Sequence, residues 1–157
     1  MSEQNILSPV EKISTDPSDD GVPEPGIALC LSGGGYRAML FHLGALKRLN
    51  DAGYLPKLDR ISSVSGGSIT AGVLGLTWSK LGFDQTGVGE HFEREVVEPV
   101  MRFATKTIDL WAILRGVLGP GTAGDQVAHS YRRHLFGRST LQDLPDRPRF
   151  VINASNL

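Results

Sequence analysis

The chain has 157 residues, of which 40% are hydrophobic, and its 16 basic and 17 acidic residues leave a formal net charge of −1. This is enough apolar material for a single core, and the balanced charge excludes a basic surface that would recruit nucleic acid. The single cysteine, Cys30, excludes an intramolecular disulfide, which suits a reducing compartment, and no spacing typical of metal ligands is present.

Residues 1–25 are predicted to form a flexible polar leader. They hold an acidic stretch at 16–20 and several prolines, a composition that cannot build a packed element. The segment has no apolar core of the signal-peptide type, and its acids argue against a transit peptide. The longest strongly apolar stretch, 69–78, is too short to cross a bilayer. A cytoplasmic location is therefore expected, with any membrane contact peripheral.

A strand, a glycine loop and a helix are predicted next. Residues 26–31 are typical of a buried strand, in which Cys30 is expected to be a small buried hydrophobe. Residues 36–49 carry apolar side chains at helical spacing, and Gly53 is a plausible helix stop. Between the two lie three successive glycines, 33–35. Such a run leaves backbone N–H groups uncovered and able to point at a negative oxygen.

A second strand-to-helix turn follows, centred on Ser65. The β-type run 60–64 leads into it, and an apolar helical stretch leaves it. A serine on such a turn projects its hydroxyl clear of the backbone, and the next helix directs its positive end at any oxyanion formed there. The usual pattern is Gly-x-Ser-x-Gly, whereas here a serine replaces the first glycine in Ser63-Val64-Ser65-Gly66-Gly67. The alternative is a serine-rich turn in which Ser65 or Ser68 caps the next helix.

Together the two units predict an α/β fold. Residues 26–81 form a βαβα unit whose parallel strands bring both loops to the carboxyl edge of the sheet, where ligands of such sheets bind. Acyl transfer needs a nucleophile and donors for the oxyanion, which Ser65 and the glycine loop supply. Arg37 either braces the glycine loop, meets an anionic head group or pairs with a surface carboxylate.

The motifs Ser32-Gly33-Gly34-Gly35-Tyr36-Arg37 and Ser63-Val64-Ser65-Gly66-Gly67 resemble those of the patatin-like phospholipases. The resemblance is strong over residues 26–82 and looser up to Asn153, and the first motif is also similar to that of the cytosolic phospholipases A. It implies a three-layer α/β/α fold with a mainly parallel sheet, and a lipid acyl hydrolase of lipid catabolism with a Ser–Asp dyad and no cofactor or metal.

By the same resemblance, Ser65 is the nucleophile of this acyl hydrolase. Gly33, Gly34, Gly35, Tyr36 and Arg37 form the oxyanion loop. The rest of the nucleophile elbow is Ser63, Val64, Gly66 and Gly67. The partner is a lipid acyl ester, met by peripheral contact with a membrane.

The aspartate of the dyad has no counterpart in the sequence. The aspartates of this type downstream of Ser65 are Asp84, Asp109, Asp125, Asp143 and Asp146. None precedes a glycine, and the single Asp-Gly pair, Asp20-Gly21, lies in the leader. We therefore expect residues 26–157 to be the amino-terminal part of the hydrolase domain, truncated after about three strands, with the aspartate beyond residue 157. The 157 residues alone are then expected to be nearly inactive, because an unactivated serine is a weak nucleophile.

Other readings of the same residues stay open. A histidine base would have to be His42, His91, His129 or His134, of which His42 is nearest the glycine loop in sequence. Gly33-x-Gly35-x-x-Ala38 also satisfies a dinucleotide fingerprint, with Asp51 or Asp59 as the acid, although the second strand ends in the Ser65 turn where that acid is required. The third alternative is a non-catalytic remnant or binding module.

The remaining elements are predicted from weaker patterns. A glycine-rich loop is expected at 80–90, followed by helices at 91–103, interrupted near Pro99, at 108–118 and at 125–136, and then by a strand-like run from Arg149. The helix at 108–118 carries an apolar stripe that includes Trp111. This stripe either packs against the core or docks on a membrane surface.

Overall fold

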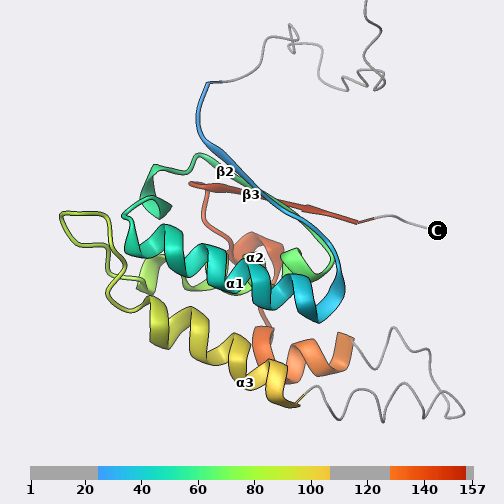
Figure 1. Cartoon of the computed structure of the whole chain (residues 1–157). Helices are drawn as coiled ribbons and strands as arrows, with labels where there is room; N and C mark the ends of the chain where they lie inside the picture. Colours follow the sequence, from blue (N-terminus) through green and yellow to red (C-terminus); the bar gives the residue numbers. More distant parts are fainter. Residues whose placement is uncertain (1–24, 107–127, 155–157) are drawn as a thin grey trace, which may run out of the picture.

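A parallel sheet of three strands organises the protein (Figure 1). The computed structural model describes residues 25–106 and 128–154. The strands are β1 (Ala28–Leu31), β2 (Arg60–Val64) and β3 (Arg149–Asn153), in that spatial order. Both pairings are parallel, so the carboxyl ends of all three strands meet at one edge. The predicted α/β class with a parallel sheet is confirmed.

Helices connect and cover the strands. After β1 comes α1 (Gly35–Asp51), after β2 comes α2 (Gly66–Thr77), and α3 (Glu98–Lys106) follows a long loop. Short 3₁₀ turns lie at Leu55–Lys57, Trp78–Lys80 and Leu141–Asp143, and π-helical turns at Glu93–Val97 and Arg132–Phe136. The predicted loop at 80–90 is present and is closed by a bridge between Phe83 and Gly89.

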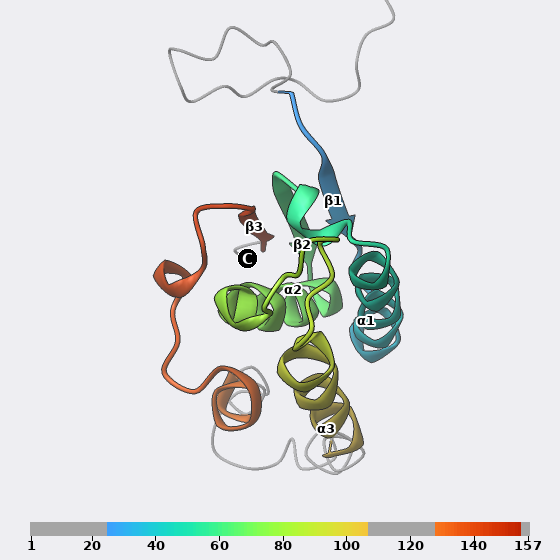
Figure 2. The same cartoon turned by 90° about the vertical axis from the view of Figure 1, so that its left-hand side faces the viewer.

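Among the described residues, the helices lie on one side of the sheet (Figures 1 and 2). Leu31 and Ile61 point to that side and are buried, whereas Cys30, their neighbour in the sheet, is exposed. The expectation of a buried Cys30 is wrong. Side chains alternate along a strand, so the register that buries Leu31 turns Cys30 to the other face.

The core is built around α2, which packs against the sheet, α1 and the π-helical turn that precedes α3 (Figure 2). Nine of its 12 residues are buried, as expected for a helix enclosed on several sides. The hydroxyl of Thr70 donates to the carbonyl of Met39 at 3.0 Å and ties α2 to α1. This central helix begins one residue after Ser65, so the core holds the start of the helix in place.

The interruption predicted near Pro99 is a change of helix type. Residues 93–97 form a π-helical turn, in which the N–H of Glu98 donates to the carbonyl of Glu93, and α3 continues from Glu98. Proline lacks the N–H that a helix interior needs. Pro99 lies where the π-helical turn ends and the α-helical turns begin. At this junction the missing N–H does not stop the helix, which continues past Pro99.

Three predicted segments extend outside the described residues. The helix at 108–118, with Trp111, lies entirely outside them, as does nearly all of the leader. Of the helix predicted at 125–136, residues 128–136 are described and are helical. The strand predicted from Arg149 is confirmed as β3.

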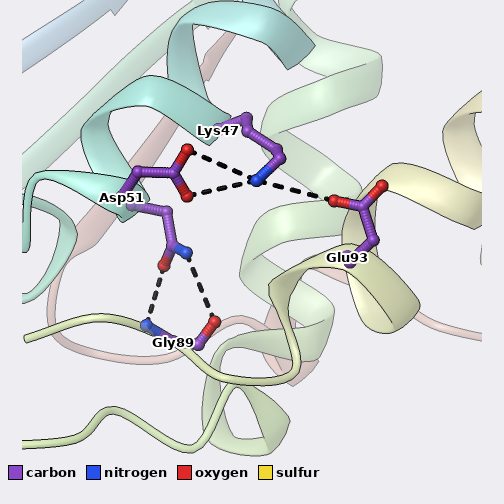
Figure 3. Close-up of polar contacts among 5 residues, drawn as sticks. Lys47, Asp51, Gly89 and Glu93 are labelled. Carbon is purple, nitrogen blue, oxygen red and sulfur yellow. Dashed lines mark hydrogen bonds and ion pairs between the residues drawn. The ribbon is translucent and has the colours of Figure 1, made fainter.

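Polar contacts fix the carboxyl end of α1 to the loop before α3 (Figure 3). Asn50 is 3% exposed and binds both backbone groups of Gly89: it accepts from the N–H at 2.9 Å and donates to the carbonyl at 3.3 Å. Beside it, Lys47 lies between Asp51 at 3.1 Å and Glu93 at 3.7 Å, on the surface. The buried amide, rather than the exposed ion pairs, is expected to hold this loop.

The Asn50→Ala variant is therefore expected to lose about 2 kcal/mol of unfolding free energy, because it leaves the buried N–H of Gly89 unpaired and leaves the carbonyl of Gly89 with the N–H of Phe92 as its remaining donor. The Lys47→Ala variant is expected to lose less than about 1 kcal/mol, as exposed ion pairs do. Urea unfolding of both variants measures the difference. Equal losses would contradict the assignment of the loop's anchor to Asn50.

Candidate active site

Ser65 has an unusual backbone conformation. Its φ is 53° and its ψ is −121°, and it is the single non-glycine residue with positive φ in the described ranges. An L-residue held there costs of order 1 to 3 kcal/mol, so the surrounding structure must enforce it. The two residues after it are closely packed, Gly66 against Gly35 and Gly67 against the carbonyl oxygens of Leu31 and Ser32, which restricts the path of the turn.

The hydroxyl of Ser65 is not used to cap α2. Ser65 occupies the N-cap position, but no side-chain hydrogen bond caps this helix. The hydroxyl of Ser68, one turn on, is buried and has no hydrogen-bond partner in the described part of the chain. The capping alternative is therefore not supported, and both serines are among the residues that line one cavity.

The glycine loop and the Ser65 turn lie in direct contact at the carboxyl edge of the sheet. A Cβ atom added at Gly33 would lie 3.2 Å from the Cβ of Ser65. One added at Gly67 would lie 2.7 Å from the carbonyl oxygens of Leu31 and Ser32. The two loops predicted to share this edge are thus adjacent.

Two helix N-termini meet beside Ser65. The helix α1 starts at Gly35 after the N-cap Gly34, and α2 starts at Gly66; neither has a side-chain cap. Gly34 and Gly35 have φ of 132° and 62°, values that glycine adopts readily. The first N–H groups of a helix lack intrahelical partners and lie at its positive end. The arrangement therefore favours a negative oxygen close to Ser65.

The remaining residues of the two motifs have different environments. Ser63 is buried beneath the sheet and Val64 is exposed on its other face. The ring of Tyr36 packs 5.9 Å from that of Phe103. Arg37 is exposed on the first turn of α1 and makes no ion pair with any described residue, so pairing with a surface carboxylate is not observed.

His42 supports the glycine loop and is not hydrogen-bonded to Ser65. It is 5% exposed, and its Nε2 lies 3.0 Å from the carbonyl oxygen and 3.2 Å from the hydroxyl of Ser32, the residue before the glycines. Sequence reasoning missed this role, since only the fold brings the helix face back to the loop. His91 lies beside Gly82, away from the site. The other two, His129 and His134, are exposed on the helix at 128–136.

None of the described aspartates hydrogen bonds to Ser65. The carboxylate of Asp84 accepts hydrogen bonds within its own loop, from the side chain of Thr86 and the N–H of Val88. These hydrogen bonds hold the pKa of its carboxyl below the ordinary value. Asp143 accepts from the N–H of Thr140 at 2.7 Å in a capping box. Asp146 is exposed. Of the aspartates considered in the sequence analysis, Asp20, Asp109 and Asp125 lie outside the described residues.

The acids that a dinucleotide site would need lie at the wrong end of the sheet. Asp51 ends α1 and pairs with Lys47. Asp59 precedes β2, where its carboxylate accepts from the N–H of Ile27 at 2.7 Å. Both positions are at the amino edge, opposite the glycine loop. In the described ranges no cluster of three or more metal-ligating side chains is found.

A cavity of about 470 Å³ opens beside Ser65, a volume typical of small-molecule sites. One end is formed by Ser65, Gly35 and Tyr36, and the walls are mainly apolar. A row of aromatic rings supports one wall: Phe103 lies 5.6 Å from Tyr131, which lies 6.3 Å from Phe136. Burial, and to a smaller extent the nearby Tyr36, raises the pKa of Tyr131. The site therefore combines the Ser65 hydroxyl, the positive ends of two helices and an apolar cavity.

Comparisons with known proteins agree with these features. Residues 29–156 match the model of the family described as patatin-like phospholipase. A protein of Saccharomyces cerevisiae named "Putative meiotic phospholipase SPO1" is 46% identical over 44 residues, which are 28% of this chain. The match spans 7% of that protein's length. No solved structure matches the chain significantly.

Proposed function

The chain belongs to the patatin-like phospholipase family, and from this premise we propose that it is a serine acyl hydrolase that cleaves lipid esters at Ser65. The observation that carries the proposal is the conformation of Ser65. A strained serine whose hydroxyl caps no helix, set between two helix N-termini, is typical of a nucleophile elbow and supports acyl transfer at Ser65.

In the proposed reaction, Ser65 Oγ attacks the carbonyl carbon of the ester. A general base takes the hydroxyl proton, and the carbonyl oxygen becomes an oxyanion. N–H groups at the start of α1 and α2, from Gly35 and Gly66, would stabilise it; that both helices begin here without a side-chain cap supports this role. The C–O bond then breaks, the leaving alcohol receives the proton, and water releases the acyl group from Ser65 by the reverse sequence.

We propose that the base is an aspartate outside the described residues. No described aspartate or histidine is hydrogen-bonded to Ser65, and His42 is engaged by Ser32. Family membership supports a Ser–Asp pair rather than a triad. The glycine loop would then supply the electrostatic part of catalysis, and the aspartate the proton transfer.

A lipid surface is the proposed place of action. The cavity beside Ser65 is mainly apolar and suits an acyl chain better than a polar metabolite. In the described part of the chain, none of the helices has the length and apolar character needed to cross a bilayer. We propose peripheral contact from the cytoplasmic side and a role in lipid catabolism, with Trp111 as a candidate contact that lies outside the described residues.

The test uses the full-length protein as its gene encodes it. It is expected to hydrolyse p-nitrophenyl and phospholipid esters, and a fluorophosphonate probe is expected to label Ser65, identified by peptide mass spectrometry. Labelling of another serine, with Ser65 unmodified, would refute the assignment. A melting temperature raised by a dinucleotide, with no labelling, would favour the nucleotide-binding alternative.

A further inference from the structure

One face of α2 forms a wall of the cavity and leads away from Ser65. The lining residues at its start and along it are Ser65, Ser68, Ile69, Gly72 and Leu76. Spacings of three and four residues place them on a single helix face. At a rise of about 1.5 Å per residue, Gly72 lies about 10 Å and Leu76 about 16 Å along the axis from Ser65. An acyl chain whose carbonyl carbon lies at the Ser65 hydroxyl can extend in this direction.

At Gly72 the opposite wall touches the helix. The ring of Phe136 lies over this residue, and a Cβ atom added there would be 3.1 Å from its Cε1 atom and 3.3 Å from its Cζ atom. The glycine is buried within α2, and the ring borders the same cavity. The pair therefore forms a contact across the cavity, between the end at Ser65 and the end at Leu76.

We propose that Gly72 and Phe136 set the length of the acyl chain that the protein accepts, an inference that rests on the proposed acyl hydrolase function. An extended hydrocarbon advances a little more than about 1 Å per carbon, so about eight carbons reach the level of Gly72. Longer chains pass beside this contact toward Leu76, which lines the same cavity. The substrates are therefore esters of medium and long fatty acyl groups, and the glycine admits the long ones.

The test measures the affinity of the full-length protein for octanoate and palmitate, by displacement of a fluorescent fatty acid. Each buried methylene contributes about fourfold to affinity. The Gly72→Val variant places a side chain against Phe136 and displaces the ring into the cavity, so its palmitate-to-octanoate affinity ratio is expected to fall by about tenfold or more. The Phe136→Leu variant widens the same point and is expected to raise the ratio. Because the two changes act in opposite directions, a general loss of folding cannot mimic both.

Gly44→Val is the matched control, since Gly44 is exposed on α1 and a Cβ atom there meets nothing within 4 Å. It is expected to keep the wild-type ratio. An unchanged ratio in both Gly72→Val and Phe136→Leu, or no fatty-acid binding by the wild type, would overturn the inference. Binding with the expected shifts but without any ester hydrolysis would refute the proposed function alone. Ser65-dependent hydrolysis with unchanged chain-length preference in both variants would refute the inference alone.

Discussion

The Ser65→Gly variant is expected to lose ester hydrolysis by about 10⁴-fold or more while becoming more stable than the wild type. The hydroxyl is the proposed nucleophile, so its removal leaves only the binding and oxyanion contributions. The stability gain comes from the backbone. At φ 53° and ψ −121° a serine carries strain of about 1 to 3 kcal/mol that glycine does not. The larger entropy of glycine in the unfolded chain offsets about 0.5 to 1 kcal/mol, which leaves a net gain of about 1 kcal/mol.

Ser65→Ala is the matched control for the strain argument. It removes the same hydroxyl but keeps a Cβ atom, so it is expected to lose activity equally and to leave the unfolding free energy near that of the wild type. Urea unfolding and initial rates on p-nitrophenyl esters measure both quantities in the full-length protein. A Ser65→Gly variant less stable than Ser65→Ala would show that the conformation is not strained, and would remove the main physical argument for a nucleophile at this position.

The parts of the fold that local patterns determine were predictable from the sequence. The alternation in Arg60–Val64 and the helical spacing after Gly35 each depend on a few consecutive residues, and both elements formed where expected. The contact between Gly33 and Ser65 followed from topology, because consecutive parallel strands bring their loops to one edge. The first strand began two residues late, because the N–H of Ile27 donates to the side chain of Asp59.

The parts that depend on contacts between distant residues were not predictable. The hydrogen bond between His42 and Ser32 depends on how α1 lies relative to the glycine loop. The cavity forms because residues 131–152 return beside α2. The exposure of Cys30 depends on which face of the sheet the helices cover. Strand alternation alone assigns two faces but does not say which is buried when both carry apolar side chains.

The Gly66→Ala variant tests the junction of the two loops, and it is expected to lose about 10²- to 10³-fold in ester hydrolysis and about 2 kcal/mol or more of stability. The added Cβ would collide with the carbonyl oxygen of Gly35 and lie 3.0 Å and 3.1 Å from its carbonyl carbon and nitrogen. The backbone atoms of Gly35 cannot rotate away from the added Cβ as a flexible side chain can. The start of α2 or the glycine loop must therefore move, which separates the oxyanion donors from Ser65.

The same substitution at Gly44 separates this collision from the general effect of alanine in a helix. Gly44 lies exposed within α1 with open space around it, so Gly44→Ala is expected to gain about 0.5 to 1 kcal/mol and to keep wild-type activity. Gly66 is at the first position of α2, where helix propensity matters least, so its loss would come from the contact with Gly35. Equal behaviour of the two alanine variants in urea unfolding and ester hydrolysis would mean that the glycine loop and the Ser65 turn do not act as one unit.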